Sequence, residues 1–181
     1  MELQGVIKNP DPALGSSQRN PVPIGKTIKT KIERGDRYSA PVIYDLEITL
    51  LEILRGQEAW ERGKAQEVLN ELAKSGFEYI LAHLKVGFFR RGRGLGGDVY
   101  EIREGQILAV SADGKTQYEI PAVPQQPQPQ LVDLSFKPGE SHSGWILLQV
   151  PKNEAKPLLL FNREYVENVF GIWGPIWFCL Y

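Results

Sequence analysis

The sequence has little of what disulfide bonding, metal binding or membrane insertion requires. It contains one cysteine, Cys179, and two histidines, His83 and His142, among 181 residues. An internal disulfide framework and a multi-cysteine metal site are therefore excluded. No apolar run approaches the roughly 20 residues that span a bilayer. Charges of the two signs almost balance, with a formal net charge of -1 at pH 7, so the whole chain has no field that attracts nucleic acid or an anionic membrane.

Short apolar segments separated by turn residues make up most of the sequence. With 181 residues and a hydrophobic content of 42%, the chain is long enough for one globular domain with its own core. Residues 144–161 contain two apolar runs parted by a Pro/Asn turn segment, which is typical of consecutive β-strands. Apolar and polar side chains alternate in residues 44–50, and at Leu51 the apolar face shifts by one residue. That shift predicts a β-bulge.

Turn signals and one helical stretch complete the expected secondary structure. Asp113 and Gly114 predict a hairpin turn, after which residues 115–120 pair back. Apolar residues at three- and four-residue spacings predict an amphipathic helix over residues 57–75, with Gly76 as its C-terminal cap. Further strands are expected at residues 24–32, 78–89, 100–102, 106–110, 131–136, 145–150, 158–161 and from residue 172 onward. The fold class is therefore all-β, an antiparallel sandwich with one short inserted helix that covers an end or an open edge.

The N-terminal region differs in composition from the rest of the chain. Residues 8–23 are dominated by proline, glycine and small polar side chains, which is typical of an extended tether or linker. We therefore expect a tether over residues 1–19 and the sandwich over residues 20–181. The first residues lack the basic flank and apolar stretch of a signal peptide. Either the protein is cytoplasmic or a signal that preceded this sequence has been removed.

Five segments in order support a resemblance to a known family: residues 20–25 (NPVPIG), 50–60 (LLEILRGQEAW), 76–86 (GFEYILAHLKV), 110–115 (VSADGK) and 144–152 (GWILLQVPK). The chain resembles a bacterial family of unknown function, found in lipoproteins and secreted proteins with an immunoglobulin-like fold. It is similar in architecture to a small secreted mycobacterial antigen. The resemblance implies an immunoglobulin-like sandwich, exported to the cell surface or the extracellular space and reaching the membrane only through an N-terminal tether. It implies no catalytic residues.

An arginine- and glycine-rich loop is the most distinctive candidate site. Arg90, Arg91 and Arg93 follow two phenylalanines and could bind phosphate, a heparin-like polymer or nucleic acid, although a solvated hairpin tip has the same composition. Residues 92–97 match G-x-G-x-x-G, but a dinucleotide site needs a helix next, and the following residues have an extended pattern. The tripeptide at residues 34–36, Arg-Gly-Asp, is explained by turn chemistry.

Catalytic patterns are weak. His83 is expected on the polar side of its strand, and His142 in a polar connection over residues 137–144 whose serines lack a nucleophile elbow. No spacing of acidic residues or histidines suggests a metal. We therefore expect a non-catalytic binding or structural module with no cofactor, no nucleic-acid partner and a protein or glycan partner at the cell surface. Two alternatives remain open: polyanion binding through the arginine loop, and a hydrolase with dispersed catalytic residues.

The C-terminus is dense in large rings. Residues 170–181 are expected to form a final strand that packs Trp173, Trp177 and Phe178 into the sandwich, because burial of such rings stabilises a domain strongly. The alternative is an apolar patch for a partner, a glycan or a second copy. Cys179, among these rings, is expected to be a small buried hydrophobe rather than a reactive thiol.

Overall fold

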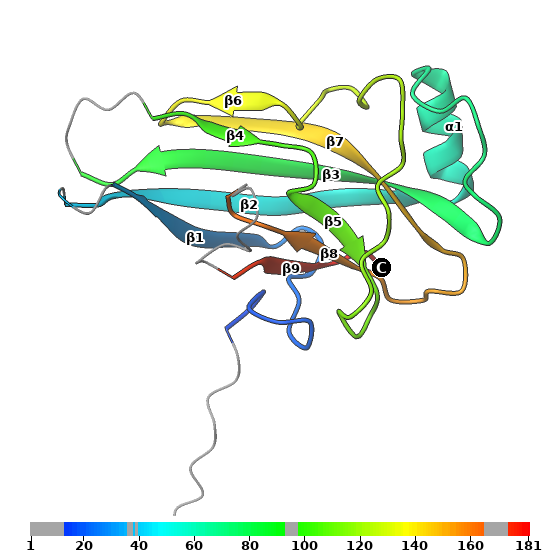
Figure 1. Cartoon of the computed structure of the whole chain (residues 1–181), viewed down its shortest axis with the longest axis horizontal. Coiled ribbons are helices and arrows are strands. Elements are labelled where there is room, and N and C mark those ends of the chain that lie inside the picture. Colours follow the sequence, from blue (N-terminus) through cyan, green and yellow to red (C-terminus); the bar gives the residue numbers. More distant parts are fainter. Residues whose placement is uncertain (1–12, 36–37, 39, 93–97, 165–173) are drawn as a thin grey trace, which may run out of the picture.

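The computed structural model describes residues 13–35, 38, 40–92, 98–164 and 174–181. Strands dominate them, and their order along the chain is shown in Figure 1. The elements are β1 (Thr27–Arg34), β2 (Val42–Arg55), α1 (Gln57–Ala65), β3 (Phe77–Arg90), β4 (Tyr100–Ile102), β5 (Ile107–Val110), β6 (Leu134–Phe136), β7 (Glu140–Pro151), β8 (Leu158–Phe161) and β9 (Ile176–Cys179).

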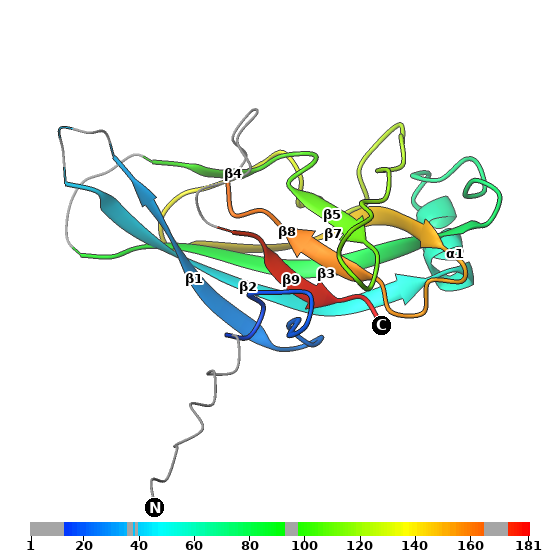
Figure 2. The same ribbon diagram turned by 60° about the horizontal axis from the view of Figure 1, so that its bottom comes forward.

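Two layers of antiparallel strands form the sandwich. The first is a large sheet in the order β1-β2-β3-β7, and the second consists of a β4-β6 pair and a β5-β8-β9 sheet. Figures 1 and 2 show both small sheets lying over the same face of the large one. The core between the layers uses alternate residues of the long strands, among them Tyr44, Leu46, Ile48, Ile80, Ala82, Leu84, Val86, Ile146 and Leu148. The predicted all-β sandwich with one short helix is confirmed, and period-two alternation places every second side chain of the long strands in this core.

The predicted β-bulge is present in β2. Leu50 pairs with Leu84 of β3, and Glu52 pairs with His83, so Leu51 is the extra residue. Leu51 is 38% exposed. Beyond it, Ile53 packs on the core between the layers, and the next residue packs on the opposite face of the sheet. The apolar run of β2 therefore serves two cores, one on each face of the sheet.

The helix is shorter than predicted, because α1 ends at Ala65 and not near residue 75. Glu67 takes a positive φ of 58°. Its N–H donates to the Lys64 carbonyl at 3.0 Å, and the Val68 N–H donates to the Gly63 carbonyl at 2.9 Å. These two bonds form a Schellman motif, which usually has glycine where Glu67 stands. The chain reverses there, so the prediction that Gly76 caps the helix is wrong.

A second, smaller core lies between α1 and the outer face of the large sheet. Val68 and Leu69, beyond the helix, are buried against Leu81 of β3 and against Trp145 and Leu147 of β7. Figure 1 shows α1 at one end of the molecule, as expected for an element that covers one end of the sandwich. The apolar residues that predicted a longer helix are used in this core, except for Leu72, which is 75% exposed.

Strand β7 begins earlier than predicted. Residues 140–143 were expected in a polar connection, but Ser141 pairs with Gly87, and His142 pairs with Val86 of β3. Pairing with β3 therefore holds these residues in β7, although their own strand preference is low. In contrast, residues 115–120 form no strand. They form the Val110–Gln117 bridge and a bond from the Tyr118 N–H to the Ala109 carbonyl at 2.9 Å. Gly114, with φ of 71°, occupies the predicted hairpin turn.

The two ends of the described chain lie side by side. The Trp177 N–H donates to the Gly15 carbonyl at 3.0 Å, and the Val22 N–H donates to the Trp177 carbonyl at 2.8 Å. Figure 2 shows this N-terminal turn beside β9. Residues 13–22 therefore belong to the folded unit, and the rest of the predicted tether, residues 1–12, lies outside the described residues.

Strand β9 supplies the expected apolar packing at the C-terminus. Phe178 is fully buried in the core between the layers, and Trp177 is partly buried against the β8 side chains. Trp173 lies outside the described residues. Cys179 is a free thiol of intermediate exposure and not fully buried.

Candidate functional site

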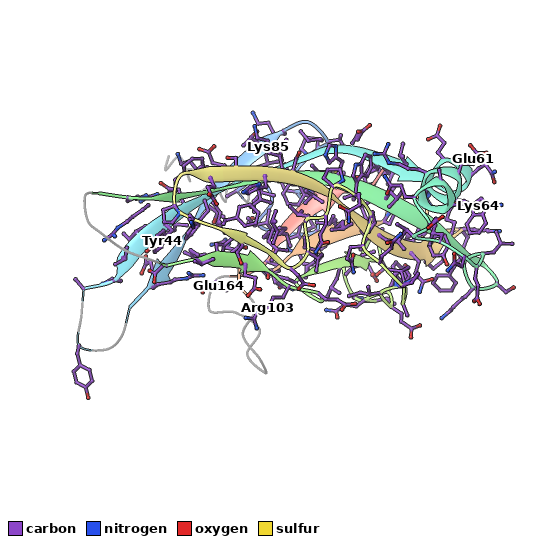
Figure 3. All side chains as sticks on the ribbon, turned by 90° about the horizontal axis from the view of Figure 1, so that it is seen from above. Tyr44, Glu61, Lys64, Lys85, Arg103 and Glu164 are labelled. Atoms are coloured by element: carbon purple, nitrogen blue, oxygen red, sulfur yellow. The ribbon has the colours of Figure 1, made fainter. Side chains whose placement is uncertain are left out.

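Aromatic rings join the two layers at the end of the sandwich that is remote from α1. Tyr44 of β2 stacks on Phe88 of β3 with ring centroids 4.6 Å apart. Phe88 stacks in turn on Tyr100 of β4 at 5.4 Å. Figure 3 shows Tyr44 and Glu164 toward one end of the molecule, and Glu61 and Lys64 of α1 at the other. The rings close the core here, and their hydroxyls bring polar chemistry into it.

Both tyrosine hydroxyls are used within this end of the core. The Tyr44 hydroxyl is hydrogen-bonded to the Asp98 carboxylate. The Tyr100 hydroxyl donates to the Arg163 carbonyl at 2.7 Å and accepts from Gln106 Nε2 at 2.9 Å. Burial raises the pKa of both phenols, and the Asp98 carboxylate raises that of Tyr44 further. Both hydroxyls therefore stay protonated over the pH range in which the protein works, and they act as hydrogen-bond donors.

Arg34, the last residue of β1, is hydrogen-bonded to two groups at this end of the sandwich. Its Nε donates to Glu164 Oε1 at 3.0 Å, and its Nη1 donates to the Val99 carbonyl at 2.7 Å. The guanidinium carbon lies 5.9 Å from the centre of the Tyr44 ring. The Arg-Gly-Asp tripeptide starts at Arg34, but its aspartate lies outside the described residues. Arg34 is therefore structural in this arrangement, which fixes the β8 end of the chain to β1.

Arg90 differs from Arg34 because it forms no ion pair with a described residue. It is the last residue of β3 and pairs in register with Tyr44, so it belongs to the inner face. Its Nε and Nη1 atoms are buried and have no hydrogen-bond partner among the described residues. A buried donor without an acceptor costs free energy, and an anionic group would remove that cost.

Arg91 is held on the other face of the sheet. Its Nε donates to Asp45 Oδ1 and Oδ2 at 2.9 Å and 3.0 Å. Its Nη2 donates to Oδ1 at 2.6 Å. These bonds hold the pKa of the Asp45 carboxyl below its usual range. Arg90 and Arg91 therefore do not form one patch, and Arg93, the third predicted residue, lies outside the described residues, as do the other residues of the glycine-rich loop up to Gly97.

Several charged groups lie at this inner end. The described side chains include the guanidinium groups of Arg34, Arg90 and Arg163 and the carboxylates of Asp98, Glu164 and Glu140, the last of which pairs in register with Phe88. Arg163 has a further buried Nε without a hydrogen-bond partner among the described residues, and burial lowers the pKa of its guanidinium. The sequence carried a signal for Arg90, because it stands in the same alternation phase as Val86 and Phe88.

The two histidines lie on opposite faces of the large sheet. His83 stacks on Trp145 with ring centroids 4.6 Å apart, and its Nδ1 is 3.4 Å from Glu52 Oε1. His142 pairs with an inward residue, Val86, and its Nε2 lies 3.6 Å from Glu140 Oε2. Each histidine has a carboxylate neighbour, but the sheet separates them. They cannot act on one substrate atom.

Neither metal ligation nor a membrane-spanning helix is found in the described part of the chain. No group of three or more His, Cys, Asp or Glu side chains there could hold a metal ion. No helix among those residues has the length and apolar character that crossing a bilayer requires.

Comparisons with known proteins add no relative to this description. No protein-family model, curated protein or solved structure matches the chain. The candidate site is therefore interpreted from its own geometry.

Proposed function

We propose that the protein is a non-catalytic binding module in which Arg90 receives an anionic group of the ligand at one end of the β-sandwich. The observation that carries the proposal is that two buried atoms of one guanidinium, Nε and Nη1, have no hydrogen-bond partner in the part of the chain that the structure describes. An oxygen of a carboxylate, sulfate or phosphate can accept a charge-assisted hydrogen bond from either of these N–H groups. Asp98 accepts from Tyr44 and Glu164 accepts from Arg34, and neither carboxylate bonds to Nε or Nη1 of Arg90.

The energetic argument gives the proposal a signature of its own. A buried donor without an acceptor destabilises the free protein, and such a cost persists in proteins mostly where function requires it. Replacing Arg90 by methionine keeps the apolar length of the side chain and removes the charge. We expect Arg90→Met to raise the free energy of unfolding by about 1 kcal/mol and to abolish anion binding. A purely structural arginine would show the opposite change in stability.

Titration with inorganic phosphate at constant ionic strength tests the site directly. The Nε–H signal of Arg90 in a nitrogen-15 NMR spectrum should shift and saturate in the wild type, and retention on a heparin column should fall with salt. Arg90→Met should lose that retention. Arg19→Gln removes an exposed arginine and should behave like the wild type, and Arg91→Gln should have a smaller effect because Asp45 already neutralises Arg91. An unchanged Arg90 signal, or equal heparin retention in Arg90→Met, would refute the site.

Two observations support a binding role over hydrolysis. His83 and His142 are on opposite faces of a sheet, and His83 is stacked flat on Trp145 with 9° between the ring planes. A dispersed triad needs a histidine between a carboxylate and a hydroxyl within hydrogen-bond reach. For His83 the structure supplies the carboxylate of Glu52, and for His142 that of Glu140, with no hydroxyl bonded to either ring among the described residues.

The proposal includes the immunoglobulin-like assignment and the extracellular or cell-surface location that the resemblance implies. A sandwich of antiparallel sheets supports the first, and a partner at the surface would be a protein or a glycan. Location has a direct test: the native protein should be recovered from the cell surface or the medium after fractionation. Recovery from the cytoplasm alone would contradict this part of the proposal and would leave the Arg90 site untouched.

A further inference from the structure

A groove of about 340 Å³ opens at the α1 end of the molecule. One wall is Trp60 of α1, another is the segment that contains Leu72 and Lys74, and the floor includes Phe77 and Tyr79 at the start of β3. Figure 1 shows this end of β3 beside α1, remote from the β3 end that carries Arg90. The groove therefore shares no residue with the proposed anion site.

Leu72 is the residue that packing does not explain. It is 75% exposed, whereas Val68 and Leu69 of the same segment are buried against the sheet. A single exposed leucine is ordinary on a protein surface. Here it stands in the lining of a groove whose other walls include three partly buried aromatic rings. The apolar atoms thus converge on one hollow, which is the usual composition of a binding pocket.

Two of the three aromatic rings in the groove already have a cation beside them, which narrows the kind of ligand. The Lys74 ammonium lies 4.6 Å from the centre of the Phe77 ring, and Tyr118 meets the same ring edge-on at 6.4 Å. The Lys64 ammonium lies 5.9 Å from the centre of the Trp60 ring. The Tyr79 hydroxyl donates to the Glu71 carbonyl at 3.2 Å. A sugar ring needs a free flat aromatic face, and a leucine-sized side chain needs only apolar edges and walls. The groove is therefore better suited to a leucine-sized side chain than to a sugar ring.

Two of the three charged side chains that line the groove are positive, and the Glu71 carboxylate acts on the lining residue Tyr79 from outside the lining. Lys74 and Lys152 both line it. The carboxylate that also lines it, Glu78, is paired with Arg55 at 2.8 Å. Lys74 reaches Glu119 at 3.6 Å, but both side chains are exposed and that pair is weak. Among the described residues Lys152 has no ion-pair partner. A complementary ligand is therefore acidic as well as apolar.

We propose that this groove binds an acidic, leucine-containing peptide segment of a partner protein. The leucine side chain would fill the space between Leu72 and Trp60, and a neighbouring glutamate or aspartate would meet Lys152. This is an interaction surface in addition to the Arg90 site, and it depends on different residues. The apolar contact gives most of the affinity, and the lysines select for acidic neighbours.

The test uses the full chain and three capped hexapeptides: one alternating glutamate and leucine, one alternating lysine and leucine, and one alternating glutamate and serine. Binding is followed by the Trp60 indole N–H signal in a nitrogen-15 NMR titration. We expect a saturable shift with the glutamate–leucine peptide and at least tenfold weaker binding of the other two. No shift with any peptide at millimolar concentration, or equal binding of the lysine–leucine peptide, would overturn the proposal.

Matched variants distinguish peptide binding in the groove from non-specific adsorption to the protein surface. Leu72→Ser and Lys152→Glu should each weaken binding of the glutamate–leucine peptide about tenfold or more. Ile24→Ser removes another exposed apolar side chain, which is 37% exposed, and Lys85→Glu makes the same charge change on the outer face of the sheet; both should bind like the wild type. Equal losses in the control variants would refute the groove. Arg90→Met should bind the peptide normally, so the two sites fail independently.

Discussion

Arg91 and Asp45, which are 46 residues apart in the chain, are joined through both carboxylate oxygens. The bond is possible because Asp45 pairs with Phe89, two residues before Arg91, so the two side chains share the outer face of the sheet. It explains why consecutive arginines have different roles. Arg91 joins the end of β3 to β2. Arg90 lies on the other face and has no acidic partner among the described residues.

This ion pair makes stability depend on pH in one direction. The pKa of Asp45 is lower in the folded protein than its usual value, because Arg91 donates to the carboxylate. The pair therefore contributes its full stabilisation above the unfolded-state pKa of about 3.9 and loses it as the pH falls through the folded-state pKa. We expect Asp45→Asn to melt at a lower temperature than the wild type at pH 7. The difference should shrink progressively below about pH 4.

Circular dichroism melts from pH 7 to pH 2 measure this effect. Glu104→Gln, which removes an exposed carboxylate with no ion-pair partner among the described residues, should follow the wild type at every pH. A gap between Asp45→Asn and the wild type that stays constant down to pH 2 would mean that the carboxylate charge is not what stabilises the fold.

Gly144 in β7 has no room for a side chain. A Cβ atom there would lie 2.7 Å from the carbonyl oxygens of Pro129 and Gln130. The segment is held at this distance by the Trp145 N–H, which donates to the Pro129 carbonyl at 2.8 Å. Gly144→Ala must displace backbone, and we expect a loss of about 2 kcal/mol in the free energy of unfolding by urea denaturation.

Gly174→Ala is the matched control for this substitution, because nothing lies within 4 Å of its Cβ position. It should change the urea midpoint little. Equal midpoints for Gly144→Ala and the wild type would show that the 129–130 segment is free to move away from β7.

Gly63 and Leu69 are coupled through the reversal after α1. A Cβ atom at residue 63 would lie 2.4 Å from Leu69 Cδ1. In a helix interior, alanine is favoured over glycine by about 1 kcal/mol. We expect Gly63→Ala to destabilise the wild type and to stabilise the Leu69→Ala variant, because the clash is then absent. A double-mutant cycle measures the coupling, and additive effects would contradict it.

Phe178 anchors the C-terminal strand. It is fully buried in the core between the layers, whereas Tyr181, three residues later, is 49% exposed. Phe178→Ala should cost about 3–5 kcal/mol, and Tyr181→Ala should cost little. Because that loss is comparable with the whole stability of many domains, truncation before Gly171 should unfold the protein. A truncated chain with an unchanged melting temperature would contradict the packing role of β9.

The strands were predictable where burial alone decides the pattern. In β3, the two-residue spacing of Ile80, Ala82, Leu84 and Val86 predicts that they share one face, and all four are fully buried. The bulge at Leu51 was equally visible, since one extra residue reverses the faces beyond it. The Arg90 site could be predicted only in part. The sequence places the three arginines close together, but only their alternation phase separates Arg90 from Arg91.

Features that depend on a distant partner or on an unusual backbone conformation could not be predicted from the sequence. The end of α1 is set by Glu67 in a left-handed conformation, a position where a glycine would have indicated the end of the helix. His142 lies in β7 because β3 supplies its ladder partner. The pairing of residues 13–22 with β9 joins two ends of the chain that share no local pattern.

The amino-acid sequence by itself determined the fold class and the strand faces, because side-chain alternation decides locally which atoms leave water. The tertiary structure alone decided which charges are neutralised, since that depends on distances between residues far apart in the chain. Arg91 meets Asp45, Arg34 meets Glu164, and Arg90 meets no acceptor among the described residues. The candidate anion site follows from that last difference.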